Sequence, residues 1–230
     1  MQPQLKYFLA GLAGLVLLIG AGVAWLGPGL VQLAFFAEGR DEPYLVMDFY
    51  DGRKSYPQVL DQGEEAWGGK RMGGYQLAYL VEGQVADEWP ALELIHFAEA
   101  NSVVQFVTSG VYLDYQNAEE NFEDIKLGSR ELVVGETRKT IVLWMVEEVG
   151  EIARGIAAIK ADLPPEVHIQ WQGTVDGVQH ETNWHHGIML GFDSYDDAMT
   201  YLRRPETTLQ RQMVRSRVQS VLLAVYESVE

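Results

Sequence analysis

Histidines are the first residues in this sequence whose type and spacing suggest chemistry. Four of the five lie in the second half, and three of these, His180, His185 and His186, fall close together. Imidazole is a common ligand of zinc, copper, nickel and iron. Neighbouring residues of an extended segment point to opposite faces, however, so His185 and His186 cannot both face one ion in a regular strand. The pattern favours a polar loop at a strand edge over a metal or haem site, and we predict no cofactor.

A second group of candidates is defined by polar or aromatic side chains within apolar segments. His96 shares a strand face with Leu92 and Leu94. This spacing predicts either a hydrogen-bonded histidine at the sheet surface or a pocket residue that acts as a base or touches a ligand. Trp144 and Trp171 lie in the middle of expected strands. Core packing explains both tryptophans, and a flat apolar ligand is the alternative. The candidate pocket residues are therefore His96, Trp144 and Trp171, with His96 as the catalytic candidate.

Arginines cluster near the C-terminus of a strongly acidic chain. The formal net charge is -16, whereas one segment of fifteen residues holds a single acid and five arginines: Arg203, Arg204, Arg211, Arg215 and Arg217. They could bind the acidic segment 114–124, an anionic membrane surface or an acidic protein partner. The overall acidity argues against a nucleic-acid partner. The absence of cysteine excludes disulfides, thiolate catalysis and Cys-ligated metals.

The N-terminus carries a continuous run of apolar or small residues, 7–26, which is followed by Gly27-Pro28-Gly29. As a helix this run spans about 30 Å, the thickness of the hydrocarbon layer. We expect a transmembrane anchor and interfacial segment over 1–37 and a linker over 38–43, with a cleaved signal peptide as the alternative. Residues 7–26 would then contact membrane lipid. The expected location is the bacterial inner membrane, with one pass and the domain outside the cytoplasm.

Two passages of similar length follow, 44–136 and 137–230, and each has the order strand, helix, strand, strand, helix, strand. The expected strands are 44–50, 74–84, 88–98 and 130–135 in the first passage, and 140–147, 167–175, 186–192 and 221–226 in the second. The expected helices are 56–70, 102–115 and 149–161, with a further one that Ser194 caps and Pro205 interrupts. This order is that of the ferredoxin-like unit. The predicted fold class is α+β: a transmembrane helix, then two tandem ferredoxin-like βαββαβ units that pack as an intrachain pseudo-dimer like a dimeric α/β-barrel.

The first passage resembles the bacterial family called domain of unknown function 1330, a dimeric α/β-barrel family. The marks of this resemblance are Tyr44, Asp48, Gly68-Gly69, Glu82-Gly83, Trp89-Pro90, Phe97, Ser109 and Tyr112. That family usually carries an acidic residue where this chain has His96. The second passage is similar to the same superfamily, with Tyr201-Leu202 and Pro205 resembling the stress-responsive A/B-barrel proteins. The resemblance implies a fold more strongly than an activity.

The sequence contains no Ser-His-Asp signature, P-loop or HExxH motif. We therefore expect a non-catalytic, membrane-anchored α/β-barrel domain with a binding or interaction role, for which an accessory subunit of an envelope complex is one form. The alternative is an enzyme of the dimeric α/β-barrel type, such as a small monooxygenase or a haem-handling protein, with a pocket between sheet and helices.

Overall fold

A computed structural model of the chain describes residues 43–51, 65–83, 90–107, 109, 124–129, 137–148, 154–161, 163–178, 184–216 and 218–229. The first half of this part contains four strands and one helix. The strands are β1 (Tyr44–Tyr50), β2 (Gly69–Glu82), β3 (Ala91–Phe97) and β4 (Asp124–Ser129), and the helix is α3 (Ala100–Val107). They follow one another in the sheet as β4, β1, β3 and β2.

The second half contains four strands and three helices among the described residues. The strands are β5 (Thr140–Glu148), β6 (His168–Val178), β7 (His186–Phe192) and β8 (Val218–Ser228). The helices are α5 (Arg154–Ala161), α6 (Tyr195–Arg203) and α7 (Pro205–Arg215). Here the order in the sheet is β8, β5, β7 and β6.

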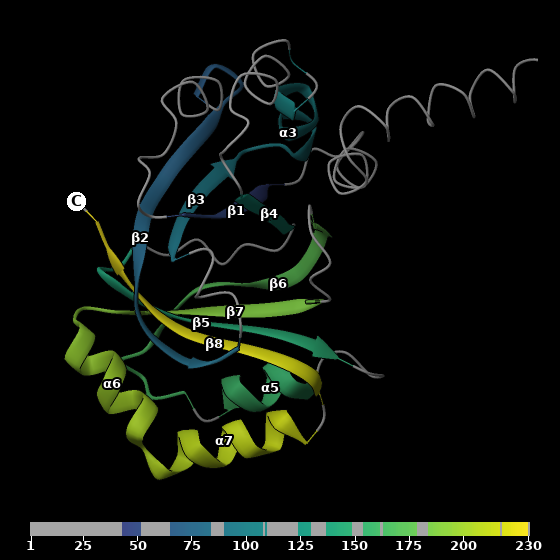
Figure 1. Cartoon of the computed structure of the whole chain (residues 1–230). Helices are drawn as coiled ribbons and strands as arrows, with labels where there is room; N and C mark the ends of the chain where they lie inside the picture. Colours follow the sequence, from purple (N-terminus) through teal and green to yellow (C-terminus); the bar gives the residue numbers. More distant parts are fainter. Residues whose placement is uncertain are drawn as a thin grey trace, which may run out of the picture.

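The two halves join edge to edge into one closed antiparallel barrel (Figure 1). One seam pairs β2 with β8 and the other pairs β4 with β6. An open sheet edge leaves a row of unpaired N–H and C=O groups, and each seam satisfies two such edges at once. Trp171 of β6 adds a side-chain contact across the second seam, because its indole N–H donates to the Ser129 Oγ of β4 at 2.9 Å.

The barrel interior is an apolar core. Alternate residues of each strand face inward, as Leu45, Met47 and Phe49 do on β1. Aromatic side chains fill much of the space, among them Tyr75, Trp171, Trp184 and Tyr226. The Tyr75 hydroxyl donates to the backbone carbonyl of Arg138 at 3.1 Å and ties β2 to the start of the second half.

A second apolar core covers the outside of the second half. Helices α5, α6 and α7 lie together against this face of the barrel, whereas α3 lies beside the first half (Figure 1). Trp144 and Ile188 of the sheet pack with Ile159, Tyr201 and Val214 of the helices. The predicted cap at Ser194 is confirmed, since its Oγ accepts a hydrogen bond from the Asp197 backbone N–H at 3.2 Å.

The predicted fold class is wrong. The sequence predicted an α+β chain of two ferredoxin-like units behind a transmembrane helix, with two separate sheets covering each other. The described residues instead form one closed eight-stranded barrel with few helices. The apolar inner faces are buried because hydrogen bonds at the two seams close the sheet on itself. The fourth strand also differs from its prediction: β4 ends at Ser129, whereas the predicted strand 130–135 lies outside the described residues.

The predicted membrane anchor is corrected as well. Within the described ranges, no helix is both long enough and apolar enough to cross a bilayer. Residues 7–26, on which the prediction rested, lie outside the described part of the chain. We therefore withdraw the single-pass inner-membrane location and the anchor over 1–37.

Gly187 tests the packing of the interior. A Cβ at this position of β7 would lie 2.5 Å from the Trp171 ring and 2.6 Å from the Met145 Sδ. We expect Gly187→Ala to lower the free energy of unfolding by about 1–3 kcal/mol, because both neighbours are buried and cannot withdraw. Urea unfolding measures this. Gly73→Ala is the matched control, since its Cβ would meet only the Tyr75 ring, at 3.2 Å. Equal losses in the two variants would contradict the packing described.

Candidate functional site

A cluster of charged and hydroxyl side chains lies on the outer face of the first half. Asp48 of β1 and Glu93 of β3 are directly opposite each other in the strand register. Both residues are 0% exposed. Two wholly buried carboxylates on adjacent strands are costly to keep charged without compensating groups, so their environment requires an explanation.

Arg71 of β2 provides part of the compensation. Its Nε contacts Glu93 Oε1, and its Nη2 donates to Glu93 Oε2 at 3.0 Å, so the guanidinium binds the carboxylate through two atoms. The Arg71 side chain is 50% exposed, while that of Glu93 is completely buried. The ion pair thus extends from solvent to the sheet surface.

Gly74 makes this pairing possible. It is the register neighbour of Glu93 on β2. A Cβ at Gly74 would lie 2.8 Å from Arg71 Nη2 and 2.9 Å from Glu93 Oε2. The bare backbone at this position therefore leaves the space that the guanidinium and the carboxylate occupy.

Tyr50 completes the cluster, which we define as Asp48, Tyr50, Arg71 and Glu93. Burial raises the pKa of the Tyr50 hydroxyl to about 12; Glu93 and Asp48 also act to raise this pKa, and Arg71 opposes them. The hydroxyl is therefore protonated at neutral pH and can act as a hydrogen-bond donor.

The second half carries apolar residues at the equivalent places. The β1–β3 pair of the first half corresponds to the β5–β7 pair of the second half. Tyr44 pairs with Phe97 at the start of β1, and Thr140 pairs with Phe192 at the start of β5, so these two pairs can be used to align the halves. Asp48 and Glu93 then correspond to Trp144 and Ile188, which also pair with each other. The counterpart of Tyr50 is Val146, two residues further along β5. The counterpart of Arg71 is Ile169, because Arg71 pairs with Ile95 and Ile169 pairs with Leu190, the residue that corresponds to Ile95. The fold thus tolerates an apolar core at this location, and the first half replaces it with charge.

His96 lies near the end of the barrel, away from this cluster. It pairs with Leu45 and with Lys70, and it faces the same side of β3 as Leu92 and Leu94. Its Nε2 is buried and has no hydrogen-bond partner within the described residues. Burial lowers the pKa of His96 from 6.5, and the positive charge of Lys70 lowers it further. The ring is therefore neutral at pH 7 and could accept a proton.

The predicted pocket residues do not all lie on one face of the sheet. Trp171 packs inside the barrel, whereas Trp144 lies outside it under the helices, so the two tryptophans are on opposite faces of the sheet. His96 faces the interior, at the end of a different strand. The role of each in ligand binding remains a prediction.

The histidine group of the second half is only partly described. His180 lies outside the described residues, His185 is exposed, and His186 begins β7. The His185 backbone N–H donates to the Val146 carbonyl at 2.9 Å, and its own carbonyl accepts from the Val175 N–H. No group of three potential metal ligands occurs among the residues that the structure describes.

The arginine group is divided among several contacts. Arg204 pairs with Glu166 at 2.8 Å, and Arg215 pairs with Glu82 at 2.7 Å. Arg203 is exposed, Arg211 is partly buried, and Arg217 lies outside the described residues. Part of the positive charge is thus matched by acids of this chain, and a protein partner for the remainder stays a prediction.

Sequence reasoning did not identify the cluster. In the sequence, Asp48 stands out only as part of the family resemblance, and paired carboxylates cannot be found before the strand register is known. Two signals were present: Asp48 and Glu93 are each the single acid of a seven-residue apolar strand. An acid at the centre of a strand with two buried faces is unusual enough to mark a site.

No protein-family model matches the sequence, so membership of the domain of unknown function 1330 family is not shown. No curated protein sequence matches it either.

Several solved structures match this chain at low sequence identity. An anthrone oxidase-like protein matches with a TM-score of 0.52 and 10% identity, over 84% of this chain and 93% of that chain. A "putative monooxygenase" from Lactobacillus acidophilus NCFM matches with a TM-score of 0.49 and 12% identity, over 81% of this chain and 94% of that chain. A protein of the same description from Fusobacterium nucleatum subsp. nucleatum gives 0.46 and 11%, over 82% and 93%.

Substitution of Arg71 tests whether its guanidinium compensates the buried charge of Glu93. Arg71→Met leaves the Glu93 carboxylate buried without the two contacts from the guanidinium. We expect a loss of about 2 kcal/mol in the free energy of unfolding, measured in urea. Arg215→Met is the matched control and should cost less than about 1 kcal/mol, because the Arg215–Glu82 pair is at the surface.

The double variant Arg71→Met with Glu93→Gln separates charge from packing. It should recover part of the loss, since no buried charge is then left without its cation. If Arg71→Met costs no more than Arg215→Met, Glu93 does not depend on Arg71.

The lowered pKa of His96 leads us to predict that the stability of the folded chain depends on pH. Its pKa is lower in the folded chain than the usual 6.5, so the unfolded chain binds the proton more readily. Stability should therefore decrease as the pH falls through 6.5 toward the lower folded pKa. His96→Gln cannot take up this proton, and its melting temperature should fall less between about pH 7.5 and about pH 5.5, a window around the ordinary histidine pKa. Equal falls in both proteins would contradict the burial of the ring.

Proposed function

We propose that this chain is a small enzyme of the barrel type, a monooxygenase that acts on a flat, largely apolar organic substrate. The observation that carries the proposal is the cluster of Asp48, Tyr50, Arg71 and Glu93, where the other half of the barrel has only apolar side chains. This proposal corresponds to the enzyme alternative that the sequence allows, and it replaces the expectation of a non-catalytic binding domain.

The carboxylates have different roles in this proposal. A carboxylate that loses an arginine ion pair on protonation is a poor base, and Glu93 has such a pair with Arg71. We therefore assign the proton-acceptor role to Asp48, which lies opposite Glu93 in the register. Arg71 and Glu93 set the electrostatic environment of that acceptor.

Tyr50 is assigned the role of hydrogen-bond donor. Burial and the two neighbouring acids keep its hydroxyl protonated, with a pKa of about 12. A fixed donor stabilises the negative charge that develops on a substrate oxygen when a proton is removed. Asp48 as acceptor and Tyr50 as donor lie two residues apart on the same face of β1.

The similarity of fold to the anthrone oxidase-like protein suggests the kind of substrate to test. An anthrone has a weakly acidic CH2 group between two aromatic rings. Transfer of one of its protons to Asp48 would leave an electron-rich anion that reduces O2. One oxygen atom would become the new carbonyl oxygen, and the other would leave as water with the two hydrogens of the CH2 group. The substrate supplies every electron that O2 takes up, so this step requires no separate reductant.

The experiment is an oxygen-uptake assay of the full-length chain with anthrone, with product identification by mass spectrometry. Asp48→Asn should lower kcat by a factor of about 100 or more, because a positioned base contributes roughly that factor. Glu82→Gln is the matched control: it also removes one carboxylate from the barrel sheet, in this case one paired with Arg215, and it should leave kcat unchanged.

Glu93→Gln separates positioning from folding. This variant should lower kcat and shift its pH profile, because the charge next to the proton acceptor has been removed, while circular dichroism remains that of the native chain. Two results would contradict the proposal: no uptake above the uncatalysed rate with anthrone and its hydroxylated analogues, or equal rates for Asp48→Asn and Glu82→Gln.

A further inference from the structure

A cavity of about 240 Å³ lies on the second half of the barrel, apart from the cluster on the first half. It is formed where β6 begins, where β7 ends and where α6 passes over both. Its lining includes Val167, Phe192 and Tyr201, together with the polar side chains of Glu166, Asp197 and Arg204. A space of this size suits a small molecule with one aromatic ring better than a drug-sized ligand.

Two aromatic rings give the cavity an apolar wall. The ring centroids of Phe192 and Tyr201 are 5.4 Å apart, with an angle of 39° between the ring planes. Both residues are almost completely buried. A ligand in contact with these rings would gain apolar contact and, if positively charged, attraction to their π faces.

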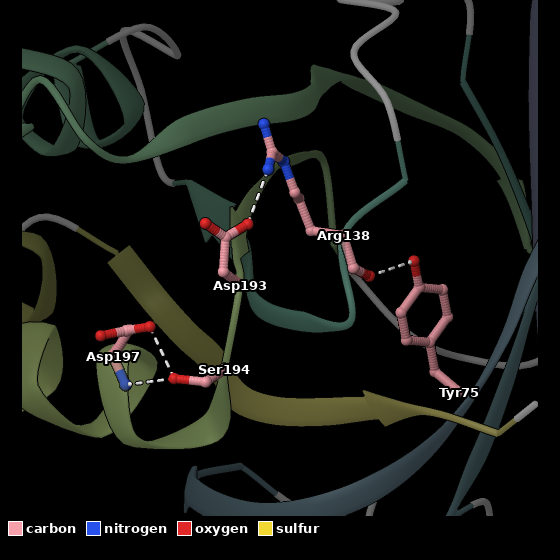
Figure 2. Close-up of polar contacts among 5 residues, drawn as sticks. All are labelled: Tyr75, Arg138, Asp193, Ser194 and Asp197. Carbon is pink, nitrogen blue, oxygen red and sulfur yellow. Dashed lines mark hydrogen bonds and ion pairs between the residues drawn. The ribbon is translucent and has the colours of Figure 1, made fainter.

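The charges around the cavity are unevenly matched. Glu166 is paired with Arg204 at 2.8 Å, and Asp193 is paired with Arg138 at 2.6 Å. Asp197 instead contacts a neutral group, the Ser194 hydroxyl, at 2.5 Å. Figure 2 shows Asp193, Ser194 and Asp197 along this edge, with Arg138 directed toward Asp193. Among the residues that the structure describes, the side-chain contact of the Asp197 carboxylate is thus a neutral hydroxyl and not a cation.

The Tyr201 hydroxyl is a second polar feature of the lining. It is buried, and it makes no hydrogen bond of normal geometry within the described residues. Burial raises its pKa to about 12, which the nearby Thr207 side chain and the charge of Arg204 oppose. The hydroxyl keeps its proton at neutral pH, and its oxygen remains able to accept a hydrogen bond from a ligand.

We propose that this cavity binds a small organic cation, an ammonium group attached to an aromatic or other apolar body. The apolar body contacts Phe192 and Tyr201, and the ammonium group lies toward Asp197. An anionic ligand is disfavoured, because the guanidinium of Arg204, which lines the cavity together with His168, already binds Glu166. The site is separate from the proposed monooxygenase cluster and does not depend on it.

The test is an NMR titration of the isotope-labelled full-length chain with benzylammonium. Benzyl alcohol is the neutral probe of the same shape, and benzoate is the anionic probe. Benzylammonium should shift the signals of Phe192 and Tyr201 and bind about three-fold or more tightly than benzyl alcohol, the scale of a charge contact at a partly exposed site. Added salt should reduce that difference.

Variants of α6 locate the binding site. Asp197→Asn should weaken benzylammonium binding about three-fold, since it removes the charge while an amide oxygen can still accept from Ser194. Asp196→Asn is the matched control: Asp196 is an acid of the same helical turn outside the cavity lining, and this variant should bind as the native chain does. Thr200→Phe fills the cavity from an exposed position and should abolish the shifts at Phe192.

Three results would overturn the proposal. Benzyl alcohol or benzoate could bind as tightly as benzylammonium, Asp197→Asn and Asp196→Asn could bind equally, or Thr200→Phe could leave the shifts unchanged. Melting curves of each variant show whether it is folded under the conditions of the titration.

Discussion

Closure of the sheet through the β2–β8 and β4–β6 seams constrains every other feature of the molecule. Once the barrel is closed, one face of each strand must fill an interior that is packed with large apolar side chains. Polar chemistry can then be placed only on the outer face or at the barrel ends. On the second half that outer face is occupied by helices α5, α6 and α7 and the apolar residues below them. The first half has the same strand order and carries a charged cluster instead.

The comparison between the halves gives this cluster its weight. A buried ion pair by itself is weak evidence for function, since such pairs also occur in structural roles and are often replaceable by apolar residues. Here the replacement is visible in the same chain, as Trp144 and Ile188 occupy the register positions of Asp48 and Glu93. The apolar solution is compatible with the fold, so the cost of burying charge in the first half calls for a reason other than folding. Catalysis provides such a reason, because a base in a dry, preorganised environment is more effective than one in water.

The sequence revealed local structure better than global arrangement. Seven-residue runs rich in apolar residues located β1 and β7 correctly, and the Ser194 cap was found from its spacing to Asp197. Closure could not be predicted, because the seams join residues far apart in the chain by backbone hydrogen bonds. The position of β4 depends on Gly128, where any Cβ would overlap the Tyr44 ring, a contact that no local pattern reveals. The site was missed for the same reason: Asp48 and Glu93 are neighbours only after the register is set.

The most direct measurement is a crystal structure of the full-length chain with a hydroxyanthraquinone, an unreactive compound that resembles the product of anthrone oxidation. Our account predicts one bound molecule per chain, on the outer face of the first half, with an oxygen atom within hydrogen-bonding distance of Asp48 or Tyr50. Because Trp144 and Ile188 fill the equivalent place in the second half, no second molecule should bind there. A ligand inside the barrel, or one against Trp144 with the cluster unchanged, would contradict the assignment of Asp48, Tyr50, Arg71 and Glu93 as the active site.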